Sequence, residues 1–158
     1  MELMLTNMQT SANGRKFIEG WEGLFLKTYD DGTGTLTIGY GHTTAAGRPV
    51  VVSGMTITQP QADAILAADL ASVEAEVSRL VTATIDQNQF DALVSFEFNT
   101  GGLGRSSLLI AVNDSKPGAT VQADFGLWVM GGGRVMQGLV RRRAAEYVLY
   151  STGQVQGP

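Results

Sequence analysis

The sequence predicts an α+β fold, because three patterns follow one another along its 158 residues. An amphipathic helical pattern ends at Glu22, two short strand patterns flank a glycine-rich turn at 31–34, and helical patterns fill most of the chain from Gln61 onward. An early hairpin followed by a run of helices is typical of the α+β class. A chain of this length suits one folding unit with a real core, which a cleft can divide into two lobes.

The first predicted helix begins with Ser11 or Asn13 as its N-cap and ends at Gly23, since glycine lets a chain leave a helix. Glu22 stands four residues after Ile18, so it lies along the apolar stripe of this helix and not opposite it. A carboxyl group against apolar packing holds its proton more readily, as a general acid must near neutral pH. The apolar residues at helical spacing are Phe17, Ile18, Trp21, Leu24 and Phe25.

A strand is predicted over 35–40, where apolar residues alternate with small or polar ones. Thr37 belongs to the polar set, so we expect its side chain to point away from the apolar face. In the partner strand over 26–31, Asp30 and Asp31 point in opposite directions if the strand runs to its end, so only one of them can face a cleft. The glycines of the intervening turn fit backbone positions with positive φ.

Glu22, Asp31 and Thr37 fall within sixteen residues and can meet around one point. Two carboxylates that face each other across a gap are what glycosidic bond cleavage needs. Each residue also has an ordinary explanation, since Asp-Asp-Gly-Thr-Gly is common turn chemistry and a glutamate near a helix end is usually solvated. Their combination indicates a hydrolase that acts on a sugar chain.

Two further helices carry clear start signals. Thr58 can cap a helix over 60–80, whose alanine-rich pattern favours helix formation. Asp86 and Gln89 form an approximate capping box for a buried helix that extends to about Phe98. The remaining segments are predicted as two short helices, a flexible glycine connector, a final helix and a frayed tail, at 105–112, 119–129, 131–133, 138–150 and from Gly153 onward.

Composition excludes several classes of function. The absence of cysteine excludes disulfides, thiol catalysis and thiolate metal sites, and a single histidine is too few for a histidine-based zinc site. We therefore expect no metal and no cofactor. A net charge of −4 argues against general nucleic-acid binding. The charge is uneven, however, because 134–143 carries four arginines and no acid, which predicts a locally positive cleft wall.

Three groups of motifs occur in order along the chain. They are Glu22-Gly23-Leu24, Tyr29, Asp31, Gly34 and 37–43 around the hairpin, then 89–96 and 98–101, and finally 107–109, Trp128 and 138–146. Together they resemble the phage-type lysozymes of the T4 lysozyme family, a glycoside hydrolase family 24-like group. The resemblance extends from about residue 10 to about residue 150, so it covers nearly the whole chain.

The resemblance implies a lysozyme-like fold within a single domain, 1–158. A small β-hairpin lobe, at roughly 13–57 with the N-terminal helix, would be joined by a long helix over 60–80 to a larger helical lobe over 81–152. 

The resemblance also implies the chemistry. Glu22 would be the general acid that protonates the leaving sugar oxygen, Asp31 the second carboxylate, and Thr37 a residue that helps to hold the attacking water. The substrate would be the β-1,4 bond between N-acetylmuramic acid and N-acetylglucosamine in peptidoglycan, cleaved with inversion and without a cofactor.

Four residues receive weaker, supporting roles from the resemblance. His42, the only histidine, is expected to be structural and hydrogen-bonded, not a catalytic base. Arg142 best matches an arginine that approaches the catalytic glutamate, with Arg141 as the alternative, although this arginine run could also be a solvated helix face. Trp128 could fill the core or line the cleft floor together with Asn99.

The implied partners are peptidoglycan glycan strands, and the implied state is a monomeric endolysin. The segment MELMLTNMQTS has no basic region followed by a long apolar run, so we expect no signal peptide, no signal-arrest-release segment and no stable membrane insertion. The enzyme would then stay in the host cytoplasm until a holin opens the membrane, and from there reach the cell wall.

Two alternative functions remain open at this point. A lytic transglycosylase uses one acid and forms an anhydro sugar. The presence of both Asp31 and Thr37 argues against this function. A non-catalytic peptidoglycan-binding protein, or another structural component of a phage, would not need catalytic residues. The presence of Glu22, Asp31 and Thr37 together argues against this alternative.

Overall fold

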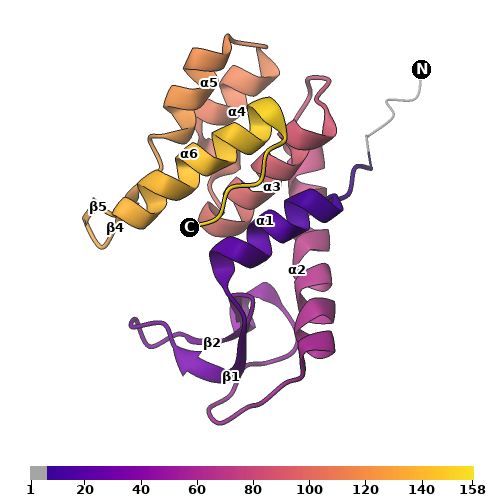
Figure 1. The fold of residues 1–158 in the computed structure, drawn as a ribbon, viewed down its shortest axis with the longest axis vertical. Helices are drawn as coiled ribbons and strands as arrows, with labels where there is room; N and C mark the ends of the chain where they lie inside the picture. The colour runs from indigo at the N-terminus through magenta and orange to yellow at the C-terminus, as the bar shows by residue number, and fades with distance from the viewer. Residues whose placement is uncertain (1–6) are drawn as a thin grey trace.

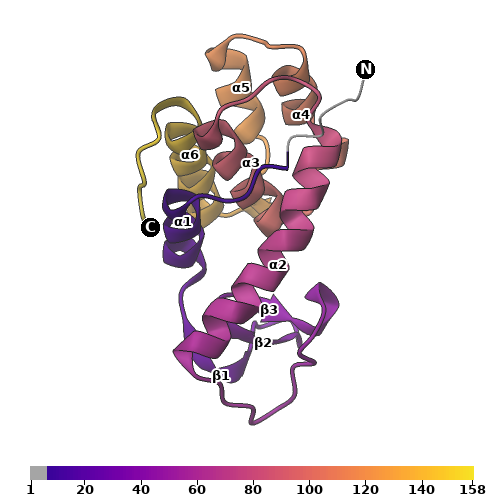
Figure 2. The ribbon, with the colours of Figure 1, turned by 90° about the vertical axis from the view of Figure 1, so that its right-hand side faces the viewer.

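In a computed structural model, which describes residues 7–158, a small sheet lies at one end of the molecule and most of the helices lie at the other (Figure 1). The long helix α2, Gln59–Leu80, extends from the sheet to the helical end (Figure 2). The α+β fold class, with a small hairpin lobe and a helical lobe joined by a long helix, is therefore confirmed. Residues 1–6, which belong to the segment considered above for an export signal, lie outside the described residues.

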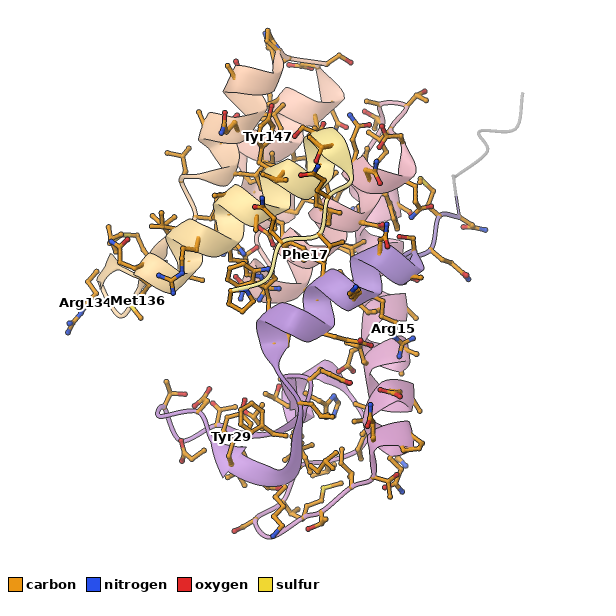
Figure 3. All side chains as sticks on the ribbon, viewed as in Figure 1. Arg15, Phe17, Tyr29, Arg134, Met136 and Tyr147 are labelled. Atoms are coloured by element: carbon orange, nitrogen blue, oxygen red, sulfur yellow. The ribbon has the colours of Figure 1, made fainter. Side chains whose placement is uncertain are left out.

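Helix α1, Ala12–Glu22, passes between the two ends of the molecule (Figure 1). Of the two N-caps considered, the structure uses Ser11, whose side chain accepts a hydrogen bond from the backbone N–H of Gly14 at 3.1 Å. Gly23 ends the helix with φ at +72°, a conformation that glycine adopts without strain. Phe17 lies between α1 and the helices above it (Figure 3), so the apolar stripe of α1 belongs to the core.

The sheet contains three antiparallel strands in the order β1-β2-β3, at Phe25–Asp30, Leu36–Gly39 and His42–Thr43. Tyr29 pairs with Thr37, and Thr37 pairs in turn with Thr43. The turn between β1 and β2 contains two glycines with φ at +93° and +88°, as the predicted turn requires. A short 3-10 helix, Thr44–Ala46, follows β3.

The predicted cap at Thr58 and the predicted capping box at Asp86 are both present, and the cap at Thr58 is a capping box as well. Thr58 caps α2 and exchanges side-chain and backbone hydrogen bonds with Gln61, and Asp86 does the same with Gln89 at the start of α3, Gln87–Thr100. Helix α3 is the centre of the helical lobe and packs against α1, α2 and the last helix, α6, Gln137–Thr152. No helix within residues 7–158 has the length and apolar character needed to cross a membrane.

The segment between α3 and α6 differs from the prediction. A 3-10 helix, Leu103–Arg105, precedes α4, Ser107–Asn113, because Ser106 caps α4 and delays its start. Helix α5 covers only Gly118–Phe125, so residue 128 lies beyond it. The predicted flexible connector is wrong: two short strands, β4 at Met130–Gly131 and β5 at Arg134–Val135, form a hairpin there. Two glycines with positive φ make its turn possible.

The predicted frayed tail is also wrong. Gly153 ends α6 in the left-handed conformation, but the chain then turns back toward α1 (Figure 1). The indole N–H of Trp21 donates to the carbonyl of Gln156 at 2.9 Å, and Val155 packs against the core. The tail therefore covers the side of α1 close to its last residue, Glu22.

Candidate active site

Glu22 is the last residue of α1, and its side chain is 17% exposed. Its Oε1 accepts a hydrogen bond from Nη1 of Arg142 at 2.7 Å, across 120 residues of sequence. Its Oε2 lies against Gly41, and any other residue at position 41 would place its Cβ only 2.8 Å from that oxygen. The two oxygens thus differ, because Oε1 is held by a cation whereas Oε2 faces a position that only glycine leaves open.

Asp31 follows the end of β1 and is exposed. Its Oδ1 accepts three hydrogen bonds, from the backbone N–H and the hydroxyl of Thr33 at 2.9 and 2.6 Å and from the backbone N–H of Thr35 at 3.3 Å. The hydrogen bond from the Thr33 hydroxyl is the largest cause that lowers the pKa of Asp31, and the backbone bonds lower it further. Asp31 is therefore held as a carboxylate, and its Oδ2 accepts none of these bonds.

Asp30 competes with Asp31 for the inward position, and its Oδ1 accepts turn hydrogen bonds from Gly32 and Gly34 at 2.8 and 3.0 Å. Burial raises the pKa of the Tyr29 hydroxyl, and the charges of Glu22 and Asp31 raise it further. Tyr29 lies in the hairpin below α1 (Figure 3). The charges that raise the pKa of Tyr29 are those of Glu22 and Asp31, which favours Asp31 over Asp30 as the residue on the side of Glu22.

Thr37 is 4% exposed, so the face of β2 that carries its side chain is covered. Both faces of β2 are covered here, since Ile38 is buried as well. Residues directly opposite each other in an antiparallel pair project to the same face. Thr37 therefore shares a face with its partner Tyr29, and its hydroxyl makes only a long hydrogen bond of 3.3 Å to the Thr35 carbonyl. The Thr37 hydroxyl is therefore weakly held, and it lies on the same face of the sheet as Tyr29, whose pKa the charges of Glu22 and Asp31 raise.

His42 is buried in β3 with both ring nitrogens occupied. Its Nδ1 lies 2.7 Å from Oδ2 of Asp69 in α2, and its Nε2 lies 2.9 Å from the carbonyl of Pro49. Burial raises the pKa of Asp69, and the hydrogen bond with His42 offsets part of that effect. With no free nitrogen, His42 ties the sheet to α2, and this arrangement favours a structural role.

Replacing His42 by alanine is expected to lower stability and to leave the specific activity of the folded protein largely unchanged. The change removes both hydrogen bonds and leaves the buried carboxyl group of Asp69 without its partner. We expect a loss of about 3 kcal/mol, which corresponds to a melting temperature lower by roughly 10 °C. Thermal melting and activity per folded molecule are the measurements. A variant that melts normally but cannot cleave the substrate would show that His42 takes part in the reaction.

Arg142 and Arg143 are buried, whereas Arg141 is exposed. Of the two arginines considered, Arg142 is the one that contacts Glu22. The predicted positive cleft wall is wrong for half of its charges, because Arg142 and Arg143 are paired with glutamates inside the protein. Arg134 remains outside, at the tip of the β4–β5 hairpin (Figure 3).

Asn99 and Trp128 line a hollow of about 390 Å³ together with Arg143, Met130 and Leu139. Trp128 packs edge-on against Phe96 with ring centroids 5.4 Å apart, so it fills the core on one side and borders the hollow on the other. Neither Asn99 nor Trp128 bonds to Glu22. Asn99 is connected to Glu22 only indirectly. Its side-chain oxygen accepts a hydrogen bond from Arg143 at 2.8 Å, and the neighbouring Arg142 binds Glu22.

Sequence reasoning did not single out several residues that surround the candidate acid and the candidate second carboxylate. Asp69 binds His42, and Ser95 and Glu146 lie behind Arg142. The available signal for Glu146 was its spacing, because it stands four residues after Arg142 and three after Arg143 in one helix. Residues 7–158 contain no group of three or more His, Asp or Glu side chains that could hold a metal ion.

Comparison with known proteins assigns the family. The chain matches the family described as Phage lysozyme over residues 19–146. It is 39% identical over 145 residues to the endolysin of Salmonella phage P22, covering 90% of this chain and 98% of that protein. It is 40% identical over 149 residues to the endolysin of Bacillus phage PZA, covering 92% of this chain but only 56% of that longer protein.

A solved structure gives the same answer. The endolysin from Escherichia coli O157:H7 phage FAHEc1 superposes with a TM-score of 0.86 at 32% identity, covering 94% of this chain and 97% of that one. The family match covers most of the residues that carry the candidate site. The chain therefore belongs to the phage lysozyme family.

Proposed function

We propose that this protein is an endolysin that hydrolyses the β-1,4 bond between N-acetylmuramic acid and N-acetylglucosamine in peptidoglycan. The observation that carries the proposal is a pair of carboxyl groups in contrasting environments, whose charges both raise the pKa of Tyr29. Glu22 is partly buried and held through one oxygen, whereas Asp31 is exposed and kept charged by hydrogen bonds from its own turn. Two carboxyl groups in different environments suit the acid and the base of a glycosidase.

In the proposed mechanism, Glu22 donates a proton from Oε2 to the glycosidic oxygen while Arg142 holds Oε1. The bond between that oxygen and the anomeric carbon breaks, and positive charge develops on the sugar ring. Water attacks the opposite face of the anomeric carbon, oriented by the Thr37 hydroxyl, and gives its proton to Asp31. Attack from the opposite face inverts the anomeric centre.

Product analysis on purified peptidoglycan tests this reaction. Hydrolysis in heavy-oxygen water should place one heavy oxygen at each new reducing-end muramic acid, since one water is consumed for every bond cleaved. A lytic transglycosylase would instead form an anhydro-muramic product without label, and a binding protein would form no product. Mass spectrometry distinguishes the three outcomes, and only the labelled reducing end supports the proposal.

We also propose that the protein acts as a monomer and a single domain, and that it stays in the host cytoplasm until a holin opens the inner membrane. The division into lobes at about residues 57–60 and 80–81 fits the positions of the sheet and of α2. The relatives named endolysins fit a role in host lysis.

Expression in a Gram-negative cytoplasm is expected to leave the culture intact until the inner membrane is permeabilised. Rapid lysis should follow permeabilisation, because a chain without cysteine needs no disulfide to become active. Culture turbidity before and after the permeabilising agent is the measurement, with Glu22→Gln as the inactive control. Spontaneous lysis by the unaltered protein would refute dependence on a holin.

A further inference from the structure

A cluster of charged side chains lies inside the helical lobe behind Glu22. Arg142, Arg143 and Glu146 come from α6, and Ser95 comes from the facing side of α3. All four side chains are buried, and Glu146 is 0% exposed. The cluster therefore occupies the contact between the two helices that form the centre of this lobe.

Glu146 binds to each other member of this cluster. Its Oε2 accepts hydrogen bonds from the Ser95 hydroxyl at 2.6 Å and from Nη2 of Arg143 at 3.2 Å. Nε of Arg143 lies 2.7 Å from Oε1, and Nε of Arg142 lies 3.5 Å from Oε2, as ion pairs without aligned N–H geometry. One carboxylate thus pairs with two neighbouring guanidinium groups, of which Arg142 also pairs with Glu22.

The gain in stability from a buried charge cluster is small, because desolvation of the charges opposes it. Complete burial raises the pKa of Glu146 and burial lowers the pKa of Arg143, which reflects the cost of removing these charges from water. Well-packed apolar residues of similar volume often stabilise a core as well as a buried ion pair does. The feature that an apolar replacement could not supply is the orientation of Arg142, whose far end holds Oε1 of Glu22 at 2.7 Å.

We propose that Glu146 is a positioning residue that fixes the general acid Glu22 through Arg142, an inference that rests on the proposed function. An arginine side chain has many rotamers, and the contacts of Arg142 with Glu146 and Ser95 restrict them. Without Glu146, Arg142 would stand next to the like charge of Arg143 and keep only the 3.3 Å hydrogen bond to Ser95 as an internal anchor. Glu22 would then lose its defined position.

The test uses Glu146→Gln, which preserves volume and removes the charge. Activity is measured on soluble glycan strands freed of cross-links, so that kcat and KM are obtained separately. We expect kcat to fall by about tenfold to a hundredfold with KM within about twofold, because a misplaced catalytic group lowers the rate more than it weakens binding. The melting curve is recorded to confirm a folded protein.

The same substitution in an Arg142→Ala background identifies the route. If Glu146 acts through Arg142, Glu146→Gln should have no further effect on kcat once Arg142 is absent. A merely structural role would reduce kcat by the same factor in both backgrounds. Asp91→Asn is the matched control, because Asp91 in α3 is, like Glu146, a 0% exposed carboxylate. It bonds to Gln87 and to Ser11, which lies at the end of α1 opposite Glu22. Asp91→Asn should lower stability and leave kcat within about twofold.

A folded Glu146→Gln variant with unchanged kcat, or equal losses in both backgrounds, would overturn the proposal. If Glu146→Gln does not fold, Ser95→Ala replaces it in the same cycle, because Ser95 bonds to both Glu146 and Arg142. Failure of the proposed function would be recognised separately by the product analysis, because the unaltered protein would then form an anhydro-muramic product or no product.

Discussion

Glu22→Gln is expected to remove nearly all lytic activity while the protein remains folded. The amide cannot deliver a proton, and loss of a general acid typically costs about a hundredfold to ten-thousandfold in rate. Its oxygen can still accept the hydrogen bond that Arg142 donates to Oε1, so the contact between α1 and α6 survives. Turbidity of cell walls gives the activity, and thermal melting verifies the fold.

Glu19→Gln is the matched control for this experiment. Glu19 lies three residues earlier in α1 and is partly exposed, and its carboxylate accepts a hydrogen bond from Arg15 at 3.2 Å, whereas Arg142 donates to Glu22. Exposed pairs of this kind contribute little, so this variant should behave like the unaltered protein. Lysis by Glu22→Gln within tenfold of the control, with normal melting, would refute the assignment of the general acid.

Asp31→Asn is expected to reduce activity by about a hundredfold or more, whereas Asp30→Asn should keep it within about threefold. Hydrogen bonds, above all from the Thr33 hydroxyl, lower the pKa of Asp31, so the carboxylate is charged throughout the neutral range. Asparagine removes that charge but can still accept turn hydrogen bonds through its side-chain oxygen. The loss should therefore be chemical and not structural.

The comparison between the two aspartates controls for damage to the turn. Each side chain accepts backbone hydrogen bonds within the same loop, so both substitutions disturb the turn to a similar extent. The measurement is the ratio of residual activities on cell walls, with the melting curves of both variants. Greater sensitivity at Asp30 would show that the inward position has been assigned to the wrong residue.

The sequence by itself determined the elements whose causes are local. Glycines with positive φ form the hairpin turn, and the caps at Thr58 and Asp86 start α2 and α3 where the side chains predicted. The spacing of apolar residues places Glu22 at the end of an amphipathic helix. Each of these features depends on interactions between residues a few positions apart, so a single sequence is sufficient to predict them.

Only the tertiary structure decided which side chains meet. Arg142 and not Arg141 reaches Glu22 across 120 residues, and the rotation of α6 against α3 determines which arginine is buried. The same packing places Glu146 beside both buried arginines. Packing at the other end of the molecule, where α2 contacts the sheet, encloses Thr37. Periodicity identifies the apolar face of an element but not what packs against its other faces, and those long-range contacts position the candidate acid.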